Sequence, residues 1–167
     1  DLGRLDEAIE CCRKALNINS NFPELYNELG NILKFQAKTG EAIEAYQKAV
    51  SLKPDYAEAH NNLGIALQDE GKIEEALVAY RTALKIKPDF AQAYNNMGNT
   101  LKEPGMIEEA VACYKKALEI RPAYSRAHSN LLSIMQYGSP PPRDWLYEAH
   151  CKWDRIHAEP LKREIAP

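Results

Sequence analysis

The chain has 167 residues, of which 45% are hydrophobic and 27% are charged, and its formal net charge is −3. This composition is typical of a soluble globular protein, and the negative charge argues against nucleic-acid binding, which needs many Lys and Arg side chains to neutralise phosphates. No apolar run approaches the roughly 18 residues that would span a bilayer, and no basic start with an apolar stretch suggests a signal peptide. We therefore expect a cytoplasmic protein, nucleocytoplasmic if its source is eukaryotic, with no membrane partner.

The chain opens within a helical pattern at Asp1. Residues 1–22 are predicted to form the second helix of a truncated repeat, so we expect the chain to be part of a longer protein.

Four cysteines are present, namely Cys11, Cys12, Cys113 and Cys151. Two are adjacent and the others are far away, which fits neither a disulfide framework nor the paired ligands of a zinc site. Free thiols in a reducing compartment are the better interpretation.

Six columns of residues recur at intervals of 34 positions, which indicates an internal repeat. They are Gly30, Gly64 and Gly98; Pro54, Pro88 and Pro122; Tyr46, Tyr80 and Tyr114; Ala8, Ala42, Ala76 and Ala110; Ala15, Ala49, Ala83 and Ala117; and Leu29, Leu63, Met97 and Leu131. Six columns at one period do not arise plausibly by chance. We expect full repeats over 23–56, 57–90 and 91–124, followed by the first helix of a partial repeat over 125–137.

The repeat over 57–90 shows how each unit is expected to fold. Apolar residues at steps of three and four predict one helix that Gly71 ends and a second helix that Pro88 stops. Gly64 is predicted to let the two helices approach closely. Tyr80 and Ala83 are predicted to fill the seam to the next pair of helices.

The starts of the first helices carry a second pattern. An acid or amide is followed three residues later by Glu or Gln, which is typical of a capping box. The pairs are Asn21 with Glu24, Asp55 with Glu58, and Asp89 with Gln92.

Some positions depart from the repeat. Ala37 stands where a turn glycine is expected, with Gly40 three residues later. Cys12 replaces the first tyrosine and Leu132 replaces the last glycine. Pro104 falls late in a first helix, where it costs little if that helix is already ending.

The pattern Leu63-Gly64, Leu67, Ala76, Tyr80, Ala83 and Pro88 resembles the tetratricopeptide repeat, and it recurs in full three times. The resemblance implies an all-α fold, a right-handed superhelical solenoid of antiparallel helix hairpins. It also implies that the first helices line a concave groove that binds a protein or an extended peptide.

Asparagines dominate the positions of the first helices that packing does not need. They are Asn27, Asn61 and Asn95; Asn62, Asn96 and Asn130; and Asn31 and Asn99. An amide offers both a donor and an acceptor, so these columns predict a ladder that binds the backbone of an extended peptide without selecting its sequence. Alternatively, some of these amides tie neighbouring hairpins together or simply face water.

A carboxylate clamp for acidic peptide tails is a rival mode of binding. It needs convergent Lys and Arg side chains from neighbouring first helices. The matching positions hold Asn27, Asn31, Asn62, Gln92 and Asn96, so the required cations are missing.

The repeat fails after Tyr137, and residues 138–167 are expected to contain a Pro-rich break, a capping or linker helix and a tail. Trp145, Ala149, Trp153 and Ile156 make one apolar stripe of that helix, which would cover the end of the stack. His150, Cys151 and His157 do not form a plausible metal site, because no partner completes a ligand set.

The tail carries a second resemblance. The residues are Ala127-His128-Ser129-Asn130-Leu131-Leu132, Met135, Tyr137, Glu148-Ala149-His150, Trp153, His157-Ala158 and Pro160-Leu161. They resemble the junction between repeats and catalytic domain in O-linked N-acetylglucosamine transferase-like proteins of the SPINDLY type. The column Asn62, Asn96 and Asn130 is also similar to that family's groove, whereas Glu28 departs from it.

These observations leave three functional hypotheses open. The chain could recruit substrates for an attached glycosyltransferase, act as a free adaptor or self-associating scaffold, or be the repeat arm of another enzyme. No nucleophile with its base and no Gly-rich phosphate loop occurs, so we expect no catalysis and no cofactor in this stretch itself.

Overall fold

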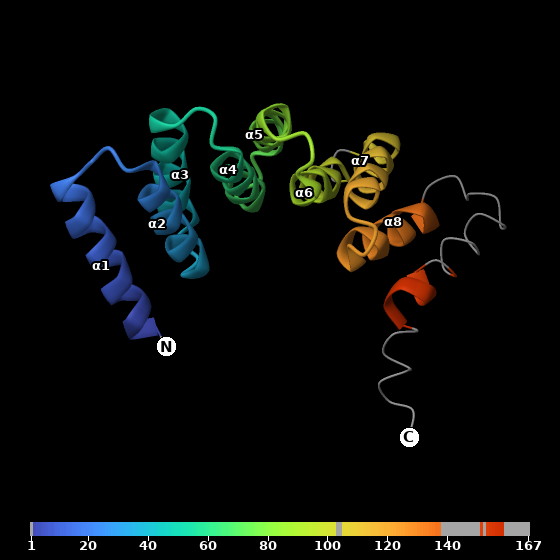
Figure 1. The fold of residues 1–167 in the computed structure, drawn as a ribbon, viewed down its shortest axis with the longest axis horizontal. Coiled ribbons are helices and arrows are strands. Elements are labelled where there is room, and N and C mark those ends of the chain that lie inside the picture. The colour runs from blue at the N-terminus through green and yellow to red at the C-terminus, as the bar shows by residue number, and fades with distance from the viewer. Residues whose placement is uncertain (1, 103–104, 138–150, 152, 159–167) are drawn as a thin grey trace, which may run out of the picture. The chain divides into compact units, whose positions relative to one another are not determined.

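The computed structural model describes residues 2–102, 105–137, 151 and 153–158, and within these residues it contains helices and no strands. The helices are α1 (Leu2–Ile18), α2 (Pro23–Phe35), α3 (Thr39–Leu52), α4 (Ala57–Asp69), α5 (Ile73–Ile86), α6 (Ala91–Lys102), α7 (Ile107–Ile120) and α8 (Ser125–Tyr137), with a short π-helical segment η1 (Asp154–Ala158) near the end (Figure 1). The predicted all-α fold class is therefore confirmed.

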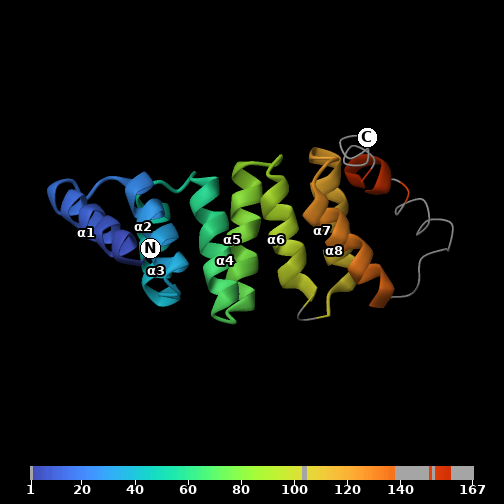
Figure 2. The ribbon, with the colours of Figure 1, turned by 90° about the horizontal axis from the view of Figure 1, so that it is seen from below.

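The chain forms two compact units, Asp1–Pro88 and Asp89–Pro167. In the first unit α2 pairs with α3 and α4 pairs with α5. Figure 2 shows α4 and α5 side by side. Helix α4 also packs on α3, and α1 packs on α2. In the second unit α6 pairs with α7, and α8 packs on α7.

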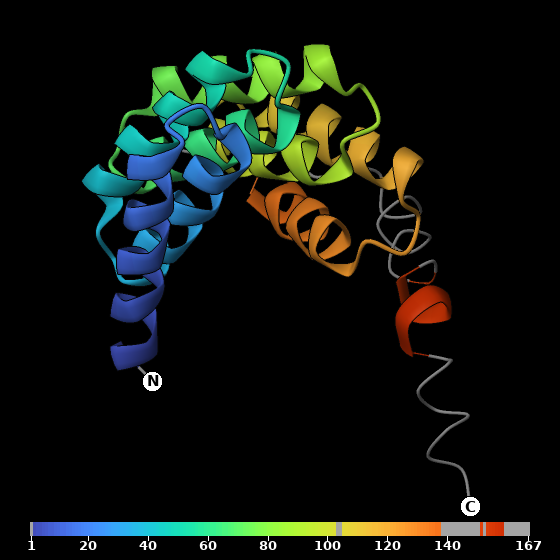
Figure 3. The same cartoon turned by 60° about the vertical axis from the view of Figure 1, so that its left-hand side comes forward.

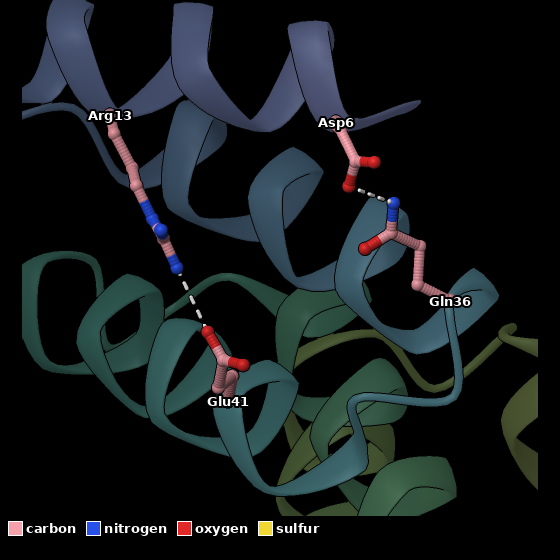
Figure 4. Close-up of polar contacts among 4 residues, drawn as sticks. All are labelled: Asp6, Arg13, Gln36 and Glu41. Atoms are coloured by element: carbon pink, nitrogen blue, oxygen red, sulfur yellow. Dashed lines mark hydrogen bonds and ion pairs between the residues drawn. The ribbon is translucent and has the colours of Figure 1, made fainter. Parts of the chain in front are cut away.

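Helix α1 runs alongside α2 (Figure 3). Polar contacts join it to the α2–α3 hairpin as well. Arg13 donates to Glu41 at 2.8 Å, and the Gln36 amide donates to Asp6 at 2.9 Å (Figure 4). Ile9 and Leu16 of α1 are buried. These contacts fix α1 against the hairpin that follows it.

The first helix of each full hairpin ends in the same turn. Gly71 and Gly105 have positive φ angles of 73° and 77°, as a residue just beyond a helix end requires. The N–H of Gly71 donates to Gln68 and that of Lys72 donates to Leu67, the two bonds of a Schellman motif. The predicted helix stop at Gly71 is confirmed.

Ala37 adopts the same left-handed turn with a φ of 58°. Its N–H and that of Lys38 donate to Lys34 and Leu33, which repeats the two bonds of the other turns. Gly40 does not supply the turn, because it lies inside α3. The turn is therefore kept although its residue is not glycine.

The predicted capping boxes are wrong at two of the three helix starts. Helix α2 begins after Phe22 and α4 begins after Tyr56, and neither cap residue makes a side-chain hydrogen bond to its first turn. Glu24 and Glu58 instead accept hydrogen bonds from lysines at the end of the same hairpin. The third box, Asp89 with Gln92, stays a prediction.

The glycine and tyrosine columns meet inside each hairpin. A Cβ placed on Gly64 would lie 2.7 Å from Cε1 of Tyr80, and the ring of Tyr80 is fully buried. Gly30 meets Tyr46 and Gly98 meets Tyr114 in the same way. Tyr80 therefore packs against Gly64 of its own hairpin. The predicted seam of Tyr80 with the next hairpin stays a prediction.

Part of the expected C-terminal helix lies outside the described residues, including Trp145, Ala149 and His150, as does Pro104. Asp154–Ala158 form a π-helical turn instead of continuing an α-helix. Over five residues a π-helix and an α-helix place apolar side chains at nearly the same spacing, so the sequence pattern does not distinguish the two kinds of helix. None of the described helices is long and apolar enough to cross a membrane.

Candidate polypeptide-binding face

The asparagines lie on the first helices of the hairpins, as the repeat predicts. Asn27 and Asn31 belong to α2, Asn61 and Asn62 to α4, Asn95, Asn96 and Asn99 to α6, and Asn130 to α8. Asn27, Asn61 and Asn95 are buried, with 4%, 5% and 0% of their surface exposed, whereas the other five are half-buried. The half-buried set is the one that a ligand can reach, and binding by either set stays a prediction.

Asn62 connects two hairpins of the first unit. Its Nδ2 donates to Oδ1 of Asn27 at 3.0 Å and to Oδ1 of Asn31 at 3.2 Å. An amide nitrogen carries two hydrogens, so these bonds use its whole donor capacity. Its Oδ1 accepts one long bond of 3.4 Å from Asn61 and keeps a free lone pair.

Asn130 repeats this link in the second unit. Its Nδ2 donates to Oδ1 of Asn95 at 3.0 Å, and Asn95 is completely buried. The alternative interpretation of these columns, that amides tie neighbouring hairpins, therefore describes Asn62 and Asn130 in this structure. It does not exclude a ligand, because the Oδ1 atoms can still accept hydrogen bonds.

Tyrosine hydroxyls hold the third asparagine column in place. Tyr46 donates to Asn31 at 2.9 Å and Tyr114 donates to Asn99 at 2.7 Å. Burial raises the pKa of both tyrosines above the ordinary value, so the phenols stay protonated and remain donors. In the hairpin between them the column holds Ile65, and Tyr80 makes a longer bond of 3.4 Å to Gln68.

An acidic residue at the start of the first helix closes each of the two hairpins of the first unit. Lys53 pairs with Glu24 and Lys87 pairs with Glu58, both at 2.8 Å. Hydrogen bonding to these lysines lowers the pKa of both carboxyl groups. Both pairs are largely exposed, so each contributes little to stability.

A pocket of about 220 Å³ opens on the face of α2 and α4 in the first unit. It is lined by Asn31, Lys34, Phe35, Tyr46, Asn62 and Ile65. Phe35 is 78% exposed, and Lys34 pairs with Asp69 at 3.0 Å from α2 to α4. The sequence predicted Asn31 and Asn62 as binding residues but did not predict Phe35. Phe35 could have been found from the repeat, because an apolar residue stands there while the next two repeats have Asp69 and Glu103.

A second pocket, of about 350 Å³, lies between α1 and the α2–α3 hairpin. Arg13 and Glu41 both line this pocket. They form an ion pair with each other (Figure 4). None of the predicted asparagines lines it.

The described residues contain no group of three His, Cys, Asp or Glu side chains that could hold a metal ion. Cys11, Cys12, Cys113 and Cys151 are all free thiols. Burial is the main cause that raises the pKa of the Cys12 thiol, and Cys11 and Glu28 add to it. This direction disfavours a reactive thiolate.

The fold and this face define a class of protein: helical-hairpin repeats that expose amides and a small pocket on their first helices. A family model described as "TPR repeat" matches residues 1–36, 38–71 and 66–105, and one described as "Tetratricopeptide repeat" matches residues 91–124. The chain belongs to the tetratricopeptide repeat (TPR) family. No curated protein matches it.

Solved structures share the fold over most of the chain. The crystal structure of MamA is 26% identical with a TM-score of 0.87, and the match covers 96% of this chain and 92% of that chain. YrrB, titled a TPR protein with an unusual peptide-binding site, is 22% identical with a TM-score of 0.74, covering 96% and 81%. The first TPR of Spaghetti (RPAP3), bound to the HSP90 peptide SRMEEVD, is 26% identical with a TM-score of 0.67, covering 69% and 91%.

Proposed function

We propose that the chain is a non-catalytic interaction module that binds an extended segment of a protein on the exposed face of its first helices. The observation that carries this proposal is the pairing of half-buried asparagines with an open pocket on α2 and α4. The Spaghetti TPR supports it, because that relative is 26% identical and holds a peptide.

The chemistry of the amides suits a polypeptide backbone. Among the described contacts, Oδ1 of Asn62 keeps a lone pair, and Asn130 uses only one of its amide hydrogens. An extended backbone offers N–H donors and C=O acceptors at regular intervals, so it can bond these groups whatever its side chains are. Asn62 in the first unit and Asn130 in the second each offer such a group.

We favour a free adaptor or scaffold over a part of an enzyme. The similarity to MamA extends over 96% of this chain and 92% of the solved MamA chain, so helical repeats account for nearly all of that relative's structure. Self-association is one form that such a scaffold could take, and Ile18 at the end of α1 is an exposed apolar residue available for it.

The second candidate is a substrate-recruiting arm of a glycosyltransferase. It rests on the resemblance of the segment from Ala127 to Leu161 to the SPINDLY-type junction, and the relatives named above add no support to it. Sequencing the gene beyond Pro167 tests it directly. A continuation into alternating strand and helix patterns would support the arm, whereas a stop codon or further 34-residue repeats would support the adaptor.

The binding role itself is tested by selecting peptides from a random library and replacing Asn62 and Asn96 by Ala. We expect each replacement to lower affinity about fivefold, the equivalent of about 1 kcal/mol for one lost hydrogen bond. Val78→Ser on the exposed face of α5 is the matched control and should leave affinity unchanged. Thermal unfolding of each variant separates loss of binding from loss of structure, because Asn62 also joins two hairpins.

Unchanged affinity in both asparagine variants, or a peptide footprint on α5 around Val78, would overturn the proposed binding face.

A further inference from the structure

Two apolar residues break the repeat pattern at the same place on the surface. Ile65 stands in a column that is otherwise Asn31, Asn99 and Ser133, and Phe35 stands where the next two repeats have acids. The residues are thirty positions apart in sequence and lie on different helices, yet both line the pocket on α2 and α4.

Neither residue is needed to build the fold. Phe35 is the last residue of α2 and is 78% exposed, so it contributes little to a core. Ile65 cannot accept a hydrogen bond as the asparagines at that position of the other two hairpins do, and Tyr80 donates to Gln68 at 3.4 Å instead. A repeat builds its structure from the residues that recur, so residues that depart from it together and converge on one pocket indicate a separate purpose.

We propose that this pocket accepts one large apolar side chain, aliphatic or aromatic, of the bound polypeptide and so gives the module a sequence preference. The inference rests on the proposed function, which by itself predicts backbone binding without selection. Phe35 and Ile65 form the apolar walls, and Asn31 and Asn62 lie beside the pocket to hold the flanking backbone.

The size and charge of the pocket identify this occupant. Its volume of about 220 Å³ is below the roughly 300–1,000 Å³ typical of small-molecule sites, so it suits a single side chain. Among the described residues that line it, Lys34 is the one with a charge, and its pairing with Asp69 at 3.0 Å offsets that charge, so the pocket is not strongly cationic. An apolar residue should therefore be preferred over an acidic one, unlike in the carboxylate clamp considered from the sequence.

The test uses the unmodified chain and a variant that restores the repeat residues at both positions, Phe35→Asp with Ile65→Asn. A peptide selected by the unmodified chain is synthesised in two forms, with its anchoring apolar residue kept or changed to Ser. We expect the unmodified chain to bind the apolar form about tenfold to a hundredfold more tightly, which is the range for burying one such side chain. The double variant should bind both forms equally, at the affinity of the Ser form.

Val78→Asp is the matched control for charge, because Val78 is an equally apolar, 61% exposed residue of the same unit that does not line the pocket. It should keep the full preference. Stability provides a second readout. Tyr80 already donates to Gln68 at 3.4 Å, and Ile65→Asn adds an acceptor at the position where Tyr46 and Tyr114 find theirs, so the melting temperature of this variant should stay close to that of the unmodified chain.

Four other outcomes would contradict the proposed pocket in different ways. An unmodified chain that binds peptides without any apolar preference would overturn this inference and leave the proposed function standing, whereas an absence of peptide binding would overturn both. A double variant that keeps the preference would place the apolar site elsewhere. A concentration-dependent dimer in sedimentation that the double variant loses would assign the pocket to a second copy of the chain and overturn the polypeptide segment as its occupant.

Discussion

At the scale of single residues, the hairpins depend on one repeated contact between a glycine and a tyrosine. The ring of each tyrosine occupies the space that a side chain at the glycine would need, and the three rings are at most 1% exposed. The departures at the ends of the repeat obey the same rule. Leu132 replaces the last glycine, and the position sixteen residues later holds Glu148 in place of tyrosine.

Gly64→Ala tests this contact, with Gly40→Ala as its control. The new methyl group would lie 2.7 Å from the ring of Tyr80, and overpacking of a core costs about 1–3 kcal/mol. A Cβ on Gly40 meets no atom within 4 Å, and alanine stabilises a helix by about 0.5–1 kcal/mol relative to glycine. Urea unfolding should therefore show opposite changes, and a stabilised Gly64→Ala protein would contradict the contact.

Ala37 is a second residue-scale feature, because it holds a left-handed turn that glycine holds in the next two repeats. This conformation costs a residue with a Cβ about 1–2 kcal/mol, part of which is offset by the greater chain entropy that glycine loses on folding. We expect Ala37→Gly to raise the free energy of unfolding by about 0.5–1 kcal/mol. Gly71→Ala, the reverse change in the equivalent turn, should lower it by a similar amount, as measured by urea denaturation of both variants.

At the scale of helices, packing alone does not connect neighbouring hairpins. Side-chain amides join α2 to α4 and α6 to α8 through bonds of 3.0 Å, each between residues 35 positions apart. These bonds link successive first helices within each unit, and they use groups that could otherwise bind a ligand. Structure and binding therefore compete for the same asparagines.

Asn130→Ala measures the contribution of one such bond. The change removes the donor for Oδ1 of Asn95, a side chain with 0% exposure, and a buried acceptor without a partner costs about 1–3 kcal/mol. We expect amide hydrogen exchange to accelerate in α8 more than in α7. Equal exchange in the variant and the unmodified chain would mean that the bond contributes nothing measurable.

Sequence reasoning succeeded where a local pattern has one structural outcome. Periodic apolar residues predicted the helices, and Gly71 predicted the end of α4, because a left-handed residue is needed there. It failed at the predicted capping boxes, because Glu24 and Glu58 had partners in Lys53 and Lys87 that are distant in sequence. The position of Phe35 in a pocket depended on the approach of two helices, which no local pattern contains.

At the scale of the whole molecule, repetition separates what builds the protein from what distinguishes it. Columns that recur, such as glycine with tyrosine, have the same environment in each hairpin. Departures such as Phe35 and Ile65 concentrate on one exposed pocket, where they cost the fold little. If the pocket acts as proposed, this TPR protein gains its binding preference from two substitutions without a change in its core.

The repeated buried tyrosines also predict how the molecule responds to alkali. Burial raises the pKa of Tyr46 and Tyr114, one in each unit, whereas an unfolded chain ionises its tyrosines near pH 10. Above that pH the unfolded state loses protons that the folded state keeps, so stability is complete below about pH 10 and falls as the pH rises further. Each tyrosine can lower the free energy of unfolding by at most about 1.4 kcal/mol per pH unit. The contribution of Tyr46 should be smaller than this limit, because Tyr46 lines an open pocket.

Urea unfolding at a series of pH values, with tyrosinate absorbance recorded in parallel, measures this decline. Tyr46→Phe keeps the ring against Gly30 but removes the titrating hydroxyl. The variant should be slightly less stable at neutral pH, because Asn31 loses a hydrogen bond of 2.9 Å, and its stability should fall less steeply above pH 10. An equally steep decline in the variant would show that the ionisation of Tyr46 does not contribute, and that other groups govern unfolding in alkali.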